Sequence, residues 1–157
     1  MNIDIIAVGK INESYFKEAI EEYTKRLARF VKLTIIGIPD EKIPDGASQK
    51  VEQQIKDREG EKILSKLKPG FTIAMCVEGT ELSSEELANK IEVVTNQASR
   101  ITFIIGGSLG LSDKVKATAN FKLSFGKPTY PHRLMRVILL EQIYRAYKIN
   151  NHETYHK

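Results

Sequence analysis

The chain has 157 residues, 41% of them hydrophobic and 28% charged, with a formal net charge of +4 and a single cysteine. These values exclude wholesale disorder, because the charged fraction lies near the globular average of about 25%, and they exclude an intrachain disulfide framework. No apolar run approaches the ~20 residues that span a bilayer, and the N-terminus lacks a basic region and a cleavage site, so we expect one cytoplasmic domain without a membrane segment.

The first half of the chain predicts two strand–helix units. An apolar run at 3–8 predicts a strand, and apolar side chains at helical spacing over 13–29 predict an amphipathic helix. A β-rich run at 33–38 predicts the second strand. Apolar positions over 51–67 then predict a second helix, which a Pro-Gly pair ends.

The second half continues the alternation. Its predicted elements are a strand at 71–77, a helix at 83–98, a strand at 101–105, a short helix at 112–119, a strand at 121–125 and a long helix at 131–150. Ser83 with Glu86 predicts a capping box, and Ser112 predicts a cap for the next helix. Strands such as 101–105 are apolar on both faces, which is typical of a buried parallel sheet. We therefore predict one α/β domain, a mostly parallel sheet with helices on both faces.

The last predicted helix is apolar on nearly all sides. Leu134, Val137 and Ile138 lie on one side, and Leu139 and Ile143 lie on another. A helix that is apolar all round is buried all round. We predict that it packs against a second copy of the chain in a homodimer; a central position inside the monomer core is the alternative.

The net charge is concentrated near the C-terminus. Residues 1–125 contain 18 Lys and Arg against 18 Asp and Glu, whereas residues 126–157 contain six against two. All three histidines, at 132, 152 and 156, also lie in this segment. The distribution predicts a local site for a polyanion, with chance clustering on a solvated helix as the alternative.

Three segments that follow strands are predicted to form one pocket, because the carboxyl ends of parallel strands open at the same edge of a sheet. They are the strand end near Cys76 and Glu78, the glycine loop 106–110 and the loop 126–130. The glycine loop has neither the G-x-G-x-x-G order of dinucleotide sites nor the lysine of a P-loop. A tight turn that needs positive φ is the alternative interpretation of its glycines.

Polar side chains of the last helix supply candidate chemistry. His132 and Arg136 are one turn apart on one helix face, and Glu141 and Arg145 have the same spacing. We interpret the second pair as a structural ion pair, although Arg145 could instead grip a phosphate or a carboxylate. No metal site is predicted, because the tail histidines have no thiolate or third ligand nearby.

The chain resembles the RlmH-type methyltransferases of the SPOUT (α/β-knot) class over essentially its whole length. The resemblance rests on the segments IDIIAVGK, FIIGGSLGL, LSFGKPTYPHRLMRVILLEQIYRAYKI and YHK. It implies a trefoil-knotted α/β fold, although chains rarely thread themselves. The domain would span 1–157, with a knot that binds S-adenosylmethionine (SAM) and a dimer helix in about 71–150, and a C-terminal tail at 151–157.

The resemblance also implies an activity, which is SAM-dependent methylation of N3 of a pseudouridine in 23S ribosomal RNA, on assembled ribosomes. A non-enzymatic RNA-binding module that uses the basic helix is the alternative. Contacts to SAM would be made by Cys76, Gly106, Phe125, Gly126, Lys127, Pro128, Thr129 and Tyr130.

The family is homodimeric, and the tail of one subunit reaches the cofactor site of the other. This implies roles for Tyr155, which could stack on the base, and for His156. The candidate proton acceptors are His132 and His156. Arg136 and Arg145 could stabilise the developing negative charge or grip a phosphate.

Overall fold

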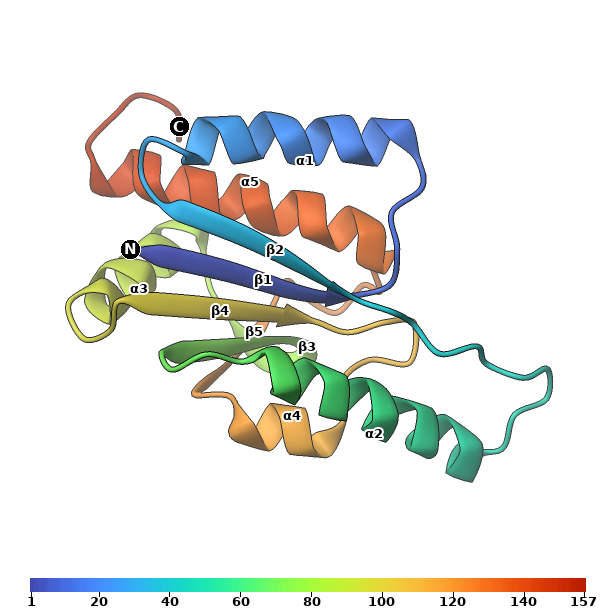
Figure 1. The fold of residues 1–157 in the computed structure, drawn as a ribbon. Helices are drawn as coiled ribbons and strands as arrows, with labels where there is room; N and C mark the ends of the chain where they lie inside the picture. The colour runs from blue at the N-terminus through green and yellow to red at the C-terminus, as the bar shows by residue number, and fades with distance from the viewer.

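A five-stranded, all-parallel sheet forms the middle layer of the protein, and the computed structural model describes all 157 residues (Figure 1). Its strands are β1 (Asn2–Val8), β2 (Lys32–Ile38), β3 (Phe71–Glu81), β4 (Arg100–Ile105) and β5 (Phe121–Ser124). The strand order is β2-β1-β4-β3-β5. All carboxyl ends therefore lie at one edge, as the sequence predicts for a pocket of loops.

Helices cover both faces of this sheet. They are α1 (Ser14–Leu27), α2 (Gln49–Lys66), α3 (Ser84–Thr95), α4 (Asp113–Thr118) and α5 (His132–Asn150). α1, α3 and α5 pack on one face and α2 and α4 on the other (Figure 1). Along β1, Ile5 joins the first core and Ile6 the second. The predicted two-sided burial is confirmed, and no helix is long and apolar enough to cross a membrane.

Helix starts follow the predicted capping chemistry. The Ser83 hydroxyl accepts from the Glu86 amide at 3.1 Å while the Glu86 carboxylate accepts from the Ser83 amide at 2.7 Å. Ser112 caps α4, as predicted. Ser48 caps α2, a start that the apolar pattern misses because the first turn carries few apolar residues. Pro131 lies at the N-cap of α5 rather than inside its first turn.

β3 is longer than its apolar run predicts. Its register against β5 shifts between Met75 and Thr80, so that the strand pairs with β5 a second time. Gly79 lies within this irregular stretch, where a Cβ atom would stand 2.8 Å from backbone atoms of Lys122 and Leu123. The absence of a side chain at this position lets the two strands approach, which the composition of the segment does not reveal.

α5 is buried on one side only within the single chain. Leu139, Leu140 and Ile143 are fully buried against the other helices and the sheet. Val137 and Ile138 are only half-buried. The monomer core therefore covers part of the apolar circumference and leaves apolar side chains such as Val137 and Ile138 half-covered, next to polar ones such as Gln142.

Candidate functional site

A cavity of about 290 Å³ lies at the carboxyl edge of the sheet. Its walls come from the three predicted segments, which are the middle of β3 near Cys76, the glycine loop after β4 and the loop after β5. His132 and Met135, from the first turn of α5, complete the wall. Most of the wall is apolar, which suits a ligand with a flat hydrophobic part.

The structure brings most of the predicted cofactor contacts to this cavity. The lining residues among them are Cys76, Gly106, Phe125, Gly126, Pro128 and Tyr130. Lys127 and Thr129 belong to the same loop but are exposed and do not line the cavity. Cys76 is half-buried, although it lies in an apolar run, because β3 leaves its regular pairing just before it. Burial still raises the pKa of the Cys76 thiol.

The loop after β5 adds backbone groups to a wall that also contains the polar side chains of Glu78, Lys116 and Tyr130. Gly126 has φ +103°, and its amide donates to Ser124 Oγ at 3.1 Å. No backbone group of residues 126–130 pairs with another backbone group. Such N–H and C=O groups can bind the polar edge of a planar ring. Apolar walls beside the unpaired backbone groups of residues 127–130 suit a planar ring with polar edges.

The glycine loop is tightly folded against itself. A Cβ atom on Gly106 would stand 2.8 Å from the carbonyl carbon of Gly110 and 3.0 Å from the Leu111 amide nitrogen. The Gly110 amide in turn donates to the Gly107 carbonyl at 3.0 Å. The turn interpretation holds for Gly110, which has φ +83°, and the same loop lines the cavity, where its binding of a ligand stays a prediction.

His132 stands where the N-terminal strand ends. Its Nε2 atom is buried without a hydrogen-bond partner and would lie 2.9 Å from a Cβ atom on Gly9, which has φ +99°. Burial, with the nearby Arg133 and Arg136 guanidinium groups, lowers the pKa of His132 below its usual value. The imidazole is therefore neutral at pH 7 and able to accept a proton.

Arg136 is a buried guanidinium, 6% exposed, without a carboxylate partner. Its Nη2 donates to the carbonyls of Val8 at 3.1 Å and Gly9 at 2.5 Å, while Nε has no partner. Burial lowers the pKa of Arg136. The side chain fixes the end of β1 beneath His132 and keeps a positive charge next to the cavity.

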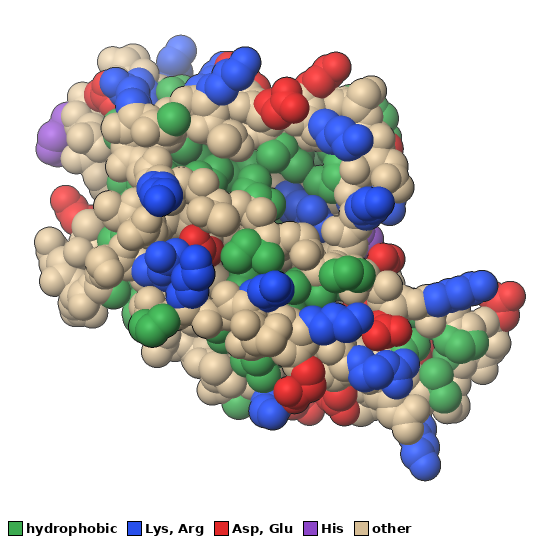
Figure 2. Space-filling view, in the orientation of Figure 1, with side chains coloured by type: hydrophobic (Ala, Val, Ile, Leu, Met, Phe, Trp, Pro, Cys, Tyr) green, Lys and Arg blue, Asp and Glu red, His purple; other side chains and the backbone are tan.

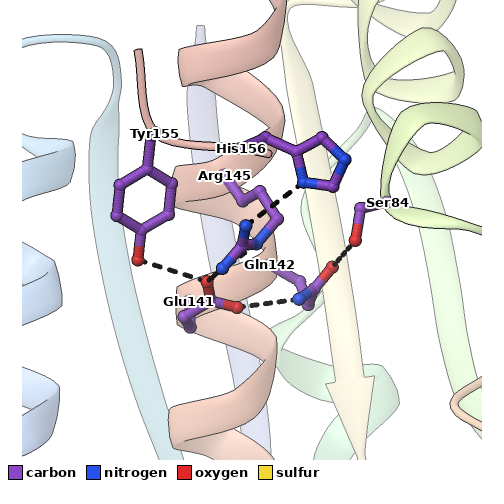
Figure 3. A network of polar contacts seen from close by, with 6 residues as sticks. All are labelled: Ser84, Glu141, Gln142, Arg145, Tyr155 and His156. Atoms are coloured by element: carbon purple, nitrogen blue, oxygen red, sulfur yellow. Dashed lines mark hydrogen bonds and ion pairs between the residues drawn. The ribbon is translucent and has the colours of Figure 1, made fainter.

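The other predicted catalytic residues lie at the opposite end of α5. Arg145 donates to Glu141 Oε1 through Nη2 at 2.6 Å and Nε at 2.9 Å, which confirms the ion pair. Arg145 Nη1 lies 3.2 Å from His156 Nδ1, and the Tyr155 hydroxyl donates to Glu141 Oε1 at 3.3 Å (Figure 3). His156 Nε2 also contacts Glu85 at 2.7 Å. None of these residues lines the cavity of their own chain.

Residues 126–157 have fewer unpaired cations for binding a polyanion than their net charge predicts. Arg133 pairs with Glu13, Arg145 with Glu141 and Lys148 with Glu153. With Arg136 buried, only Lys127 and Lys157 are exposed without an ion pair. Figure 2 shows Lys and Arg side chains spread over one face of the molecule, with histidines at two opposite edges. The predicted polyanion site is therefore not one continuous basic patch in this segment.

Glu59 is a buried polar residue that the sequence interpretation missed. It is 5% exposed on α2, between the buried Ile55 and Ile63. The signal was readable, because a carboxylate spaced four residues from an isoleucine on each side lies on the buried stripe of a helix.

Known proteins resemble the whole chain. A family model described as "Predicted SPOUT methyltransferase" matches residues 1–156. A protein of Bifidobacterium animalis subsp. lactis named ribosomal RNA large subunit methyltransferase H is 55% identical over 159 residues, covering 100% of both chains. A Clostridium perfringens protein of the same name is 55% identical over 161 residues, again covering 100% of both.

Solved structures share the fold at low identity. A methylase family protein from Neisseria gonorrhoeae has TM-score 0.53 and 11% identity, covering 99% of this chain and 86% of that one. A methyltransferase from Legionella pneumophila, solved with bound SAM, has TM-score 0.52 and 13% identity, covering 94% of this chain and 66% of that one.

Proposed function

Because the chain belongs to the SPOUT methyltransferase family, with full-length relatives named ribosomal RNA large subunit methyltransferase H, we propose that it methylates large-subunit ribosomal RNA. The methyl donor is SAM, and the methylated atom is N3 of a pseudouridine in 23S ribosomal RNA. One observation carries the proposal. The three strand-end segments, far apart in sequence, enclose a mostly apolar cavity with free backbone groups, next to a neutral histidine.

The residues of the cavity have separable tasks. When bound, SAM supplies an electrophilic methyl group on a sulfonium. The loop 126–130 and Gly106 hold the donor through backbone groups, and the main effect of such a site is to position the reacting atoms. N3 of the base carries a proton that must leave, and His132 accepts it as the neutral imidazole. Arg136, which lies behind His132, stabilises the negative charge that develops on the base.

Arg145, Tyr155 and His156 contribute to the cavity of a partner subunit in a homodimer. The half-buried side of α5, with Ile138 and Gln142, borders a groove that also contains Phe125 and Tyr130 of the cofactor loop. A partner packed on α5 would therefore lie beside the cofactor cavity. Its Tyr155 and His156 could then reach a site that they do not reach in their own chain.

Ile138→Glu is expected to convert the homodimer into a monomer. The substitution places a charge in an apolar contact, where an unpaired charge is costly. Analytical ultracentrifugation at micromolar concentration measures the result. Tyr15→Glu on α1, an equally drastic change of an apolar side chain that is 64% exposed, is the control and should leave the dimer intact. An Ile138→Glu protein that sediments as a dimer would contradict the proposed interface.

The activity is tested in cells and in vitro. Ribosomal RNA from a strain that lacks the gene should lose one methyl group on a 23S pseudouridine by mass spectrometry, and the purified protein with SAM should restore it. We expect faster methylation of assembled ribosomes than of RNA fragments, because the unpaired cations of the C-terminal segment, Lys127 and Lys157, do not form a continuous basic patch for bare RNA. Such a substrate also places the protein in the cytoplasm. An unchanged methylation pattern in the deletion strain would refute the proposal.

A further inference from the structure

A second cavity, of about 180 Å³, lies on the other side of the glycine loop. Its wall comes from the segment after β2, from α2 and from the glycine loop. Gly107, Leu109 and His132 line both cavities. A group in the second cavity therefore lies next to a group in the cofactor cavity, with His132 between them. The volume is several times the ~30 Å³ of one water molecule, and it suits a single ring.

Glu59 supplies an unused hydrogen-bond acceptor to this second cavity. Its Oε2 atom accepts from the Glu41 amide at 3.0 Å, whereas Oε1 makes no hydrogen bond within the chain. Oε1 faces the glycine loop, since a Cβ atom on Gly107 would lie 3.7 Å from it. Burial raises the pKa of Glu59, and Asp40 and Glu41 add to the effect. Because Oε1 is not sealed inside the core, it is open to the cavity and can accept a hydrogen bond from a ligand there.

The charge of the cavity indicates what it binds. Asp40, Glu41 and Glu59 line it against a single basic residue, Lys42. Glu41 is already engaged by Lys62 at 3.2 Å. The acidic residues do not form a group able to hold a metal ion. An acidic wall repels phosphate and favours a ligand that presents N–H donors, as the edge of a nucleobase does.

We propose that the second cavity receives the target base, and that Glu59 accepts the N1–H that pseudouridine has and uridine lacks. The inference rests on the proposed function. In pseudouridine the ribose is attached to carbon, so N1 carries a hydrogen, whereas in uridine N1 is bonded to the ribose. N1 and N3 flank the same carbonyl carbon. A base that turns N3 toward the methyl donor therefore presents N1–H on its neighbouring edge, where the free Glu59 oxygen stands.

The inference is tested with Glu59→Gln on two substrates, ribosomes that carry pseudouridine at the target and ribosomes that carry uridine there. The amide keeps the size of the side chain, and its oxygen can still accept from the Glu41 amide. An NH₂ group then replaces the free acceptor. We expect the ratio of kcat/KM for pseudouridine over uridine to fall about 10- to 100-fold, mainly through loss on pseudouridine. Glu59→Asp, which keeps the carboxylate, should retain part of the ratio.

Controls separate this inference from folding and from the proposed function. Glu61→Gln, on the same helix, changes an exposed glutamate paired with Lys114 and should leave the ratio unchanged. The Kd for SAM and the melting temperature of Glu59→Gln should match those of the wild type. An unchanged ratio, or an equal loss on both substrates, would overturn the role of Glu59. A wild-type protein that methylates neither substrate would instead refute the proposed function.

Discussion

Gly106→Ala is expected to weaken SAM binding by about 10- to 100-fold. The added methyl group would stand 2.8 Å from the carbonyl carbon of Gly110 and 3.0 Å from its oxygen. Both neighbours are backbone atoms of the same tight loop, so they cannot swing aside as a side chain can. Overpacking of this kind costs about 1–3 kcal/mol, which the free loop relieves by shifting. SAM binding must then restore the original loop shape, and each ~1.4 kcal/mol that this requires corresponds to a tenfold increase in Kd. Isothermal titration calorimetry measures the affinity directly.

Gly37→Ala is the matched control for this substitution. Gly37 lies inside β2, has no unusual φ, and an added Cβ atom would meet nothing within 4 Å. We expect an unchanged Kd for SAM and an equal or slightly higher melting temperature. If Gly106→Ala bound SAM as tightly as Gly37→Ala, the glycine loop would not be part of the cofactor site.

The fold was largely predictable from the sequence because most helices and strands have a local signal in the residues that form them. Runs such as 101–105, apolar on both faces, indicate a parallel sheet, and the serine caps mark helix starts. The extension of β3 was not predictable, since it depends on the approach of β5 at Gly79, 42 residues before the start of that strand. The trefoil knot stays a prediction from the family, because no periodicity encodes how a chain threads.

The cavity at the carboxyl edge of the sheet was predictable for a topological reason. In a parallel sheet every strand ends at the same edge, so three loops after three strands converge whatever their separation in sequence. The prediction that places His132 and Arg145 in one catalytic site does not hold within a single chain. They are 13 positions apart on one helix, which the helical rise converts into roughly 20 Å. The two residues therefore cannot serve one site within a single chain.

Because these residues lie far apart along α5, the proposed dimer is what would bring them together in one site. His132 lines the cavity and Arg136 is buried one turn behind it, while Arg145, Tyr155 and His156 form a network near the far end of the same helix (Figure 3). Packing α5 against a partner would bring one end of each helix toward the other end of its neighbour only in an antiparallel arrangement. Dimerisation in that orientation would complete two identical sites.

His132→Ala is expected to lower the single-turnover rate of methyl transfer by about 10²- to 10⁴-fold, the usual contribution of a positioned proton acceptor. The Kd for SAM should change little, because His132 forms only one edge of a wall that three other segments build. His152→Ala, which removes an exposed histidine of the tail, is the control and should retain full activity. His156→Ala, measured in parallel, tests the other candidate acceptor.

The pH profile gives the same residue a second test. Burial and the two neighbouring guanidinium groups lower the pKa of His132, so the acceptor is neutral at pH 7 and becomes protonated only as the pH falls below about 6.5. The wild-type rate should therefore be level from pH 7 to 8 and decline in acid. Without His132 the proton of N3 must leave to solvent, so the residual rate of His132→Ala should keep rising with pH. A wild-type rate that climbs steadily above pH 7 would show that His132 is not the acceptor, because the neutral form is already complete there.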